Sequence, residues 1–241
     1  MELNNKLIHP DTAVLITSYT GFKNPEIKRM MLNSLVNHLD DGVTFICVAS
    51  HSPVDVETQN HCNLVIYDPN NSWQICGIPY RPNHGVAELT SIHNGINALK
   101  RFGFKYILKQ CFDVCPVVNY NTMINKCKAM NKKLVTYENA TDLGTLMFFS
   151  EIEFFEKTLS LDEIWRFEGA IERGWKDSIR EKGLLNEVMG FDYDNFNNLI
   201  GLKEGQQLHY SHFREDGNLL HDYPYGTVGI LAPYGRVGIL A

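Results

Sequence analysis

Residues 13–20, AVLITSYT, combine an apolar, β-branched run with a polar end. Such a run is typical of a strand buried in a parallel sheet, and its polar end predicts a loop at which a ligand can bind. Pro25 then begins a segment whose apolar residues recur at helical spacing as far as Leu39, which predicts a helix. The chain therefore opens with a strand and a helix, as expected of an α/β fold.

The alternation continues over the first 150 residues, where short buried runs predict strands and one-sided apolar patterns predict helices. We expect further strands over residues 43–50, 63–68, 105–112, 133–138 and 143–150, and helices over 86–102 and 121–130. This order predicts a mostly parallel, Rossmann-like sheet flanked by helices on both faces.

From Glu151 onward the pattern becomes helical. No low-complexity linker interrupts the chain, so we expect a single domain over residues 1–241. We expect residues 1–150 to form its sheet lobe and residues 151–241 to form a helical lobe or lid with a tail. The tail repeats an apolar segment, YGTVGILAP and then YGRVGILA, within residues 225–241. It is either an ordered or frayed apolar tail, or an exposed strand edge through which copies associate into a homo-oligomer.

Composition excludes several classes of protein. The net charge is −6, from 22 basic and 28 acidic residues, which argues against binding nucleic acid through bulk electrostatics. No apolar run is long enough for a membrane span, and residues 1–10 do not resemble a signal peptide. We therefore expect a cytoplasmic protein. No GxGxxG motif follows the first strand, which disfavours a dinucleotide-binding oxidoreductase.

The six cysteines include no CxxC pair and no histidines at matching spacing, so the sequence gives no support for a zinc site. We expect reduced and mostly buried thiols.

Polar residues cluster where the predicted strands end, which is where ligands bind in open parallel sheets. These residues are Thr17, Ser18, Tyr19, Ser50, Asp68 and Asp113. Hydroxyl groups and an aromatic ring can hydrogen-bond to a nucleobase and stack on it. Asp113 can bind a divalent metal that neutralises a diphosphate, although an aspartate close to Pro116 can equally cap a turn.

Lys109 lies inside the fourth predicted strand, where a buried charge requires a partner. It can contact a phosphate near Asp113. Alternatively, it lies at a strand edge with its ammonium group in water.

Residues 84–113 resemble the segment of inverting GT-A glycosyltransferases in which a glycine and a helical arginine–asparagine pair precede the metal-binding DxD strand. Gly85 matches the glycine and Asn94 matches the asparagine, whereas His93 stands where arginine is usual. Asp113 matches the last acidic residue of the motif. Cys111 replaces the first aspartate, so the motif is degenerate.

The resemblance covers roughly residues 13–170. Residues 15–19, LITSY, look like the first nucleotide-binding strand of this superfamily, and Ser50 stands where an acidic residue often contacts the nucleoside. Residues 142–155 look like the later strand and turn that shape the acceptor side. The resemblance implies a GT-A-like fold in which residues 1–150 are the nucleotide-binding lobe and residues 151–241 the acceptor or lid lobe. It also implies a nucleotide-sugar donor, a glycan or other hydroxyl acceptor, and Mn²⁺ or Mg²⁺ as cofactor.

Inverting transfer also needs a carboxylate that deprotonates the acceptor hydroxyl. The comparable acidic positions are Glu168 and Glu172, which share one face if the segment is helical, with Asp142 as a further candidate. Such residues can also be the solvated face of a helix. The family often recruits a late histidine to the metal or diphosphate, which selects His209 and His212.

The leading prediction is a GT-A glycosyltransferase. A catalytically degenerate GT-A-like binding or scaffold protein is the non-enzymatic alternative, which the eroded acidic motif keeps open. A sugar-nucleotidyltransferase ranks lower, because residues 18–25, SYTGFKNP, lack a glycine-rich phosphate loop after the first strand.

Overall fold

The structure, a computed structural model, describes residues 7–17, 44–50, 53–68, 84–111, 118–166, 171–199, 230–232 and 235–237. Its main strands are β1 (Thr12–Thr17), β2 (Phe45–Ser50), β3 (Leu64–Tyr67), β4 (Tyr106–Cys111), β5 (Leu134–Glu138), β6 (Leu143–Glu151) and β7 (Val188–Phe191). The helices are α2 (Val56–Gln59), α3 (His84–Arg101), α4 (Tyr120–Ala129), α5 (Ile152–Thr158), α6 (Ile171–Glu181) and α7 (Tyr193–Leu199), with the short 3₁₀ helices η2 (Leu161–Arg166) and η3 (Leu185–Glu187).

The seven strands form a mixed sheet in the order β3-β2-β1-β4-β6-β5-β7. All of them point the same way except β6, which runs antiparallel to its neighbours β4 and β5. The predicted strands of residues 1–150 and the two predicted helices α3 and α4 are confirmed. The α/β class and the mostly parallel sheet are therefore confirmed, while the helix predicted over residues 25–39 lies outside the described residues.

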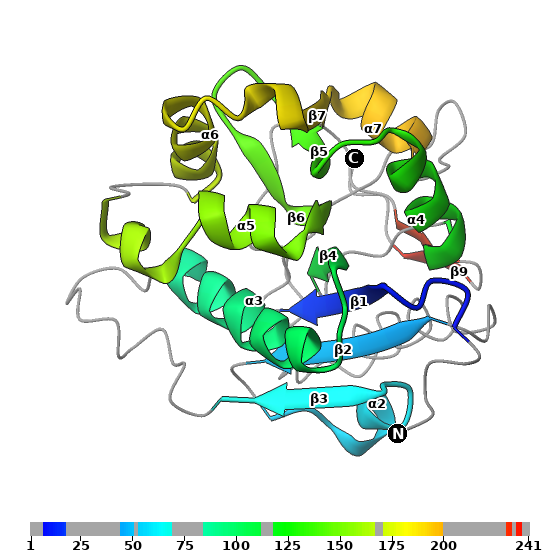
Figure 1. Cartoon of the computed structure of the whole chain (residues 1–241). Coiled ribbons are helices and arrows are strands. Elements are labelled where there is room, and N and C mark those ends of the chain that lie inside the picture. Colours follow the sequence, from blue (N-terminus) through cyan, green and yellow to red (C-terminus); the bar gives the residue numbers. More distant parts are fainter. Residues whose placement is uncertain are drawn as a thin grey trace.

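Helices cover both faces of the sheet, and each face has its own apolar core. Figure 1 shows the strands stacked from β3 to β7, with α3, α5 and α6 on one side and α4 and α7 on the other. The core under α3, α5 and α6 contains Leu15, Phe148 and Trp175. The core under α4 and α7 contains Ile16 and Phe149. Adjacent strand residues thus point to opposite cores, because side chains alternate along a strand.

Gly95 allows α3 to pack directly against β1. A Cβ atom at this position would lie 2.4 Å from Cδ1 of Leu15, which is buried in the centre of the sheet. No side chain larger than hydrogen fits without a shift of the helix or of Leu15. Gly95 therefore fixes how closely the second half of α3 approaches the middle of β1.

The region from residue 151 is only partly helical. The helices α5, α6 and α7 agree with the prediction, but β7 was not predicted and pairs in parallel with β5 in the main sheet. Its four half-buried residues, VMGF, are too few to show a strand pattern in the sequence. Gly190 of β7 leaves room for a neighbouring side chain, since a Cβ there would overlap the Glu138 carboxylate.

The tail repeat contains β8 (Ile230–Ala232) and β9 (Gly235–Val237), which pair in antiparallel fashion as a separate two-stranded sheet. The strand character of the repeat agrees with its composition. Its use in self-association stays a prediction.

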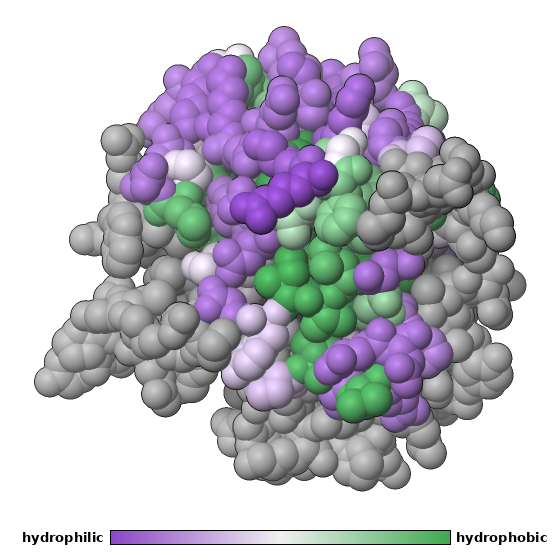
Figure 2. All heavy atoms as spheres, turned by 60° about the horizontal axis from the view of Figure 1, so that its bottom comes forward, coloured by the Kyte–Doolittle hydropathy of each residue, from purple (hydrophilic) through white to green (hydrophobic). Residues whose placement is uncertain are grey.

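Within the part of the chain that the structure describes, β3 pairs only with β2 and so borders the sheet. Its residues Leu64, Val65 and Ile66 are half-buried and Tyr67 is exposed. Figure 2 brings this side of the molecule forward and shows apolar surface in its middle. Across the described residues, no helix combines the length and the apolar character needed to traverse a bilayer.

Candidate active site

The strand order reverses between β1 and β4. The chain leaves β1 towards β2 and β3, whereas β4 lies on the other side of β1. In open α/β sheets, ligands bind outside the carboxyl ends of the strands at such a switch point. The last residues of the two strands, Thr17 and Cys111, are register partners. The chemistry at this pair of strand ends therefore decides what the site can do.

A buried ion pair lies beside these strand ends. Lys109 of β4 is fully buried, and its ammonium group contacts the Glu88 carboxylate of α3, whose side chain is 18% exposed. Lys109 Nζ also donates to Cys111 Sγ at 3.0 Å and to the carbonyl oxygen of Thr145, on β6, at 2.6 Å. These three contacts use all three ammonium protons. Lys109 thus supplies charge to the interior and keeps no N–H group for a phosphate.

This arrangement corrects one interpretation of Lys109. The side chain is not at a strand edge with its tip in water, because β4 lies inside the sheet between β1 and β6. The Phe148 ring, whose centroid is 6.0 Å from Nζ, also shields it. The charge is tolerated because a carboxylate from a different element faces it.

The network keeps both partners charged. Burial alone would raise the pKa of Glu88, but the Lys109 charge and hydrogen bonds from Lys109, Thr17 and Cys111 lower this pKa below its usual value. Burial alone would lower the pKa of Lys109, but Cys111 and Glu88 together raise it. Opposite charges and hydrogen bonds to the charged form outweigh desolvation in both cases.

Thr17 joins this network from the end of β1. Its hydroxyl group donates to Oε1 of Glu88 at 2.5 Å. Because a hydroxyl has a single proton, Thr17 Oγ1 keeps only acceptor capacity for any other partner. Thr17 is therefore suited to accept a hydrogen bond from an N–H or O–H group of a ligand.

The network reaches Glu172 through Thr145. The Thr145 hydroxyl donates to Oε1 of Glu172 at 2.7 Å, while the Thr145 carbonyl oxygen accepts from Lys109. Glu172 lies in the first turn of α6 and is half-buried. Thus Thr17, Lys109 and Glu172, which the sequence analysis selected separately, belong to one connected set of contacts.

Asp142 lies in the turn between β5 and β6, at the same edge of the sheet, because β6 is antiparallel and begins where β5 ends. Its Oδ1 is 3.5 Å from Nε of Arg173, and its Oδ2 accepts from the Thr141 hydroxyl at 2.7 Å. Lys176 holds α6 to this turn through the carbonyl oxygen of Asn139 at 2.6 Å. These contacts join the turn to the half of α6 that carries Glu172.

Asp68 and Asn94 also meet, although they are 26 residues apart. Nδ2 of Asn94 on α3 donates to Oδ2 of Asp68, directly after β3, at 2.9 Å. The backbone N–H of Asp68 donates to the carbonyl oxygen of Ser50 at 3.1 Å, and Ser50 is buried at the end of β2. Three predicted nucleotide-binding residues therefore lie together at the carboxyl ends of β2 and β3.

His93, which stands where the resembled family has arginine, faces the core instead of this edge. It is 8% exposed, and its Nε2 donates to the carbonyl oxygen of Leu159 at 2.8 Å. Burial lowers the pKa of His93, against opposing contributions from this hydrogen bond and from Glu156. A neutral imidazole that ties α3 to the end of α5 does not replace a cationic arginine.

Several predicted site residues lie outside the described residues, namely Ser18, Tyr19, Asp113, Glu168, His209 and His212. All of the predicted metal ligands are in this group. The described part of the chain contains no group of three or more His, Cys, Asp or Glu side chains that could hold a metal ion. The described residues thus provide no donor set for Mn²⁺ or Mg²⁺, and both ions stay predictions.

Glu88 and Thr145 were not predicted as site residues from the sequence. A signal for Glu88 was present: it lies four residues before Ile92 and so shares the apolar face of α3. A carboxylate on a buried face, together with a lysine in a buried strand, indicates an internal ion pair. Thr145 had no such signal, because threonine is ordinary in strands.

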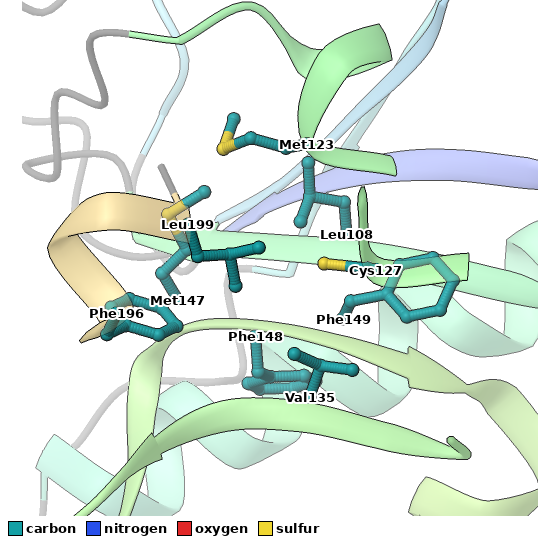
Figure 3. Close-up of a pocket in the computed structure, with 9 residues that line it drawn as sticks. All are labelled: Leu108, Met123, Cys127, Val135, Met147, Phe148, Phe149, Phe196 and Leu199. Carbon is teal, nitrogen blue, oxygen red and sulfur yellow. The ribbon is translucent and has the colours of Figure 1, made fainter. Parts of the chain in front are cut away.

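The opposite face of the sheet offers a different kind of space. An apolar crevice lies beneath α4 and α7, and Figure 3 shows Leu108, Met123 and Phe149 among the side chains around it. Its lining has no charged side chain, and carbon and sulfur atoms predominate. It therefore lacks the polar groups that would orient a nucleotide.

No protein-family model matches the chain, and no curated protein matches its sequence. Among solved structures, the chain is similar to a 4-diphosphocytidyl-2C-methyl-D-erythritol synthase from Anaerococcus prevotii DSM 20548, at 12% identity and a TM-score of 0.47, over 76% of this chain and 90% of that one. It is also similar to a protein from Desulfovibrio desulfuricans G20 named as a nucleotide-diphospho-sugar transferase, at 10% identity and a TM-score of 0.45, over 76% and 80% of the two chains. These values are too low to assign an activity to this chain.

Proposed function

We propose that the chain is a glycosyltransferase that transfers a sugar from a nucleotide-sugar donor to an acceptor hydroxyl group. The observation that carries the proposal is the connected set Thr17, Glu88, Lys109, Thr145 and Glu172 at the switch point of the sheet. It links the end of the first strand, where the resembled family binds the nucleotide, to a carboxylate suited to deprotonate an acceptor.

The donor's nucleoside is assigned to the carboxyl ends of β1, β2 and β3. Thr17 offers acceptor lone pairs, and the Asp68–Asn94 pair offers a carboxylate that Asn94 orients. Nucleobase N–H groups and ribose hydroxyl groups are donors that match these acceptors. Ser18, Tyr19 and Ser50 complete the proposed nucleotide-binding set.

The proposed catalytic base is Glu172. One carboxylate oxygen is held by Thr145, which orients the other for an acceptor hydroxyl, and the Asp142–Arg173 contact supports the same helix turn. In the reaction, the acceptor oxygen attacks the anomeric carbon, Glu172 takes its proton, and the nucleoside diphosphate leaves. Glu168 and Asp142 are the other candidates for this base.

The leaving diphosphate also needs positive charge. Asp113, His209 and His212 are the proposed ligands of a divalent ion that supplies it, and no step assigned to the described residues depends on that ion. Lys109 contributes to the site through its contacts with Glu88, Thr145 and Cys111.

Isothermal titration with UDP-, GDP- and CDP-sugars, with and without Mn²⁺, tests the proposal. We expect one nucleotide series to bind and to be slowly hydrolysed. Glu172→Gln should lower turnover by about 10²-fold or more with little change in donor affinity, because the base acts on the acceptor. Glu181→Gln, at the far end of α6, is the matched control.

The outcomes separate the candidate functions. Binding without any turnover, in the presence of a range of sugar acceptors, favours the catalytically degenerate binding protein that the loss of the first motif aspartate to Cys111 suggests. Absence of nucleotide binding would contradict the proposal. An unchanged affinity in Asp113→Ala would contradict the assignment of the metal to that residue.

A further inference from the structure

Cys111 lies next to an amine in the interior. Its Sγ is 3.0 Å from Nζ of Lys109 and 3.3 Å from Oε1 of Glu88. Cys111 and Lys109, both on β4, are buried: Cys111 is 3% exposed and Lys109 is fully buried. They are two residues apart, so they point to the same face of the strand. A thiol, an ammonium group and a carboxylate thus lie in contact with one another.

The other described cysteines have different surroundings. Burial, with a smaller contribution from Cys62, raises the pKa of the Cys47 thiol to about 12. Burial likewise raises the pKa of Cys127 to about 12. Cys62 Sγ donates to the carbonyl oxygen of Thr58 at 3.1 Å. Such thiols are poor nucleophiles because the thiolate is suppressed. Cys111 differs from them in having a nitrogen and a carboxylate at contact distance.

We propose that Lys109 and Cys111 form an oxidation-dependent covalent crosslink in which one oxygen atom bridges Nζ and Sγ. The two atoms are already at hydrogen-bond distance, so an inserted oxygen requires little movement of either side chain. The oxidant is dissolved O₂, a small molecule. This modification site does not depend on the proposed glycosyl transfer.

The reaction balances with the groups present. The ion pair keeps Lys109 and Glu88 charged, so the reacting form is the minor one, in which Glu88 has taken one proton from the Lys109 ammonium group and left a neutral amine. The amine, the Cys111 thiol and O₂ then give Lys–NH–O–S–Cys and one water molecule. The N–O and O–S bonds form, and one N–H bond, the S–H bond and the O–O bond break. Nitrogen and sulfur each lose two electrons, and O₂ gains four.

The crosslink would change the site by removing charge. Lys109 would no longer be an ammonium ion, and Glu88 would be left protonated in place of its ion pair. The hydrogen bond from Thr17 to Glu88 depends on that carboxylate. Oxidation would therefore alter the end of β1, and a thiol reductant would restore it.

Mass spectrometry of the whole chain tests the proposal. The chain is kept either under reductant or in oxygen-saturated buffer without reductant, and is then denatured. After oxidation we expect a mass gain of one oxygen less two hydrogens, and five titratable thiols in place of six. Trypsin should no longer cut after Lys109, because the crosslinked side chain is not a substrate. Dithiothreitol should reverse all three changes.

Variants locate the crosslink. Cys111→Ser and Lys109→Arg should abolish the mass gain, whereas Cys47→Ser should retain it. The wild-type digest is informative even if a variant folds poorly. The proposal is overturned if the oxidised chain is still cleaved after Lys109. It is equally overturned if Cys111 gains oxygen without loss of hydrogen, or if Cys111→Ser shows the same gain as wild type.

Discussion

The side chains on the two faces of β4 are buried in different surroundings. On the face towards α3, Lys109 is enclosed with Glu88 and every ammonium proton has an acceptor. On the face towards α4, Leu108 packs among apolar side chains that leave a crevice between them. Neighbouring residues of one strand thus contribute to a charged network on one side and to an apolar core with a small crevice on the other.

The two faces should differ in how well they tolerate substitutions. A buried network must be complete, because a single missing partner leaves a desolvated charge. An apolar core tolerates small gaps at moderate cost. The α3 face should therefore respond sharply to single changes and to pH, whereas the α4 face should respond mainly to lost volume.

The largest effect is expected from breaking the ion pair. Lys109→Met leaves the Glu88 carboxylate, whose side chain is only 18% exposed, without its partner and should lower the free energy of unfolding by about 3 kcal/mol. The double variant Glu88→Leu/Lys109→Met removes both charges and should recover most of this loss. Urea denaturation followed by circular dichroism measures both. Equal losses in the single and double variants would contradict a charge effect.

On the apolar face, Met123→Ala enlarges the crevice shown in Figure 3. Met123 is 1% exposed, and the change should cost about 2 kcal/mol, near the low end for methionine, because the side chain already borders empty space. Met130→Ala, at the half-buried end of α4, is the control and should cost less. A loss for Met123→Ala near the upper end of the methionine range, about 5 kcal/mol, would show that the crevice is well packed in solution.

The pH dependence of the free energy of unfolding also distinguishes the α3 face of β4 from its α4 face, because the ion pair lies on the α3 face. The pKa of Glu88 is lower in the folded than in the unfolded protein. Its contribution to the free energy of unfolding is therefore complete above the unfolded pKa of about 4.3 and is lost as the pH falls through the folded pKa. The pKa of Lys109 is higher in the folded than in the unfolded protein. Its contribution to the free energy of unfolding is therefore complete below the unfolded pKa of about 10.4 and is lost as the pH rises through the folded pKa. The double variant should lose both dependences.

Urea midpoints measured across this pH range compare wild type with the double variant. The difference between the two curves separates the effect of the pair from that of other groups. One such group is His93, whose pKa is lower in the folded protein, so that it destabilises the fold below about pH 6.5 in both proteins. A difference that stays constant with pH would show that the pKa values of Glu88 and Lys109 are the same in the folded and the unfolded protein.

The smallest effect is expected for a surface ion pair. Lys100 contacts Glu156 at 2.8 Å, with side chains 45% and 28% exposed. Lys100→Ala should change the free energy of unfolding by less than about 1 kcal/mol, since solvent screens the pair. A loss comparable to that of Lys109→Met would contradict the role of burial. The same denaturation assay makes the comparison direct.

Much of the fold was predictable because it depends on local patterns. The strand of residues 13–20 and the helix around Leu89 and Ile96 have apolar residues at the spacing of the element that forms. The strand β7 was not predictable, since it is four residues long and depends on β5 for its hydrogen bonds. Its pairing is a property of the sheet and not of its own sequence.

The candidate site was predictable only in part. The rule that ligands bind at strand ends selected Thr17 and Asp68, and the resemblance selected Asn94. Their actual partners were beyond sequence reasoning: Glu88 binds Thr17 from 71 residues away, and Asn94 binds Asp68 from 26 residues away.

The sequence by itself determined the α/β class and the order of most elements, because hydrophobic periodicity acts over a few residues. It placed a lysine in the fourth strand but did not decide between a buried position and a strand edge, because that depends on which strands lie beside β4. Only the tertiary structure decided that Glu88 and Cys111 enclose that lysine, and that Thr145 connects it to Glu172. Those contacts join four separate elements, and their formation depends on how the helices pack on the sheet.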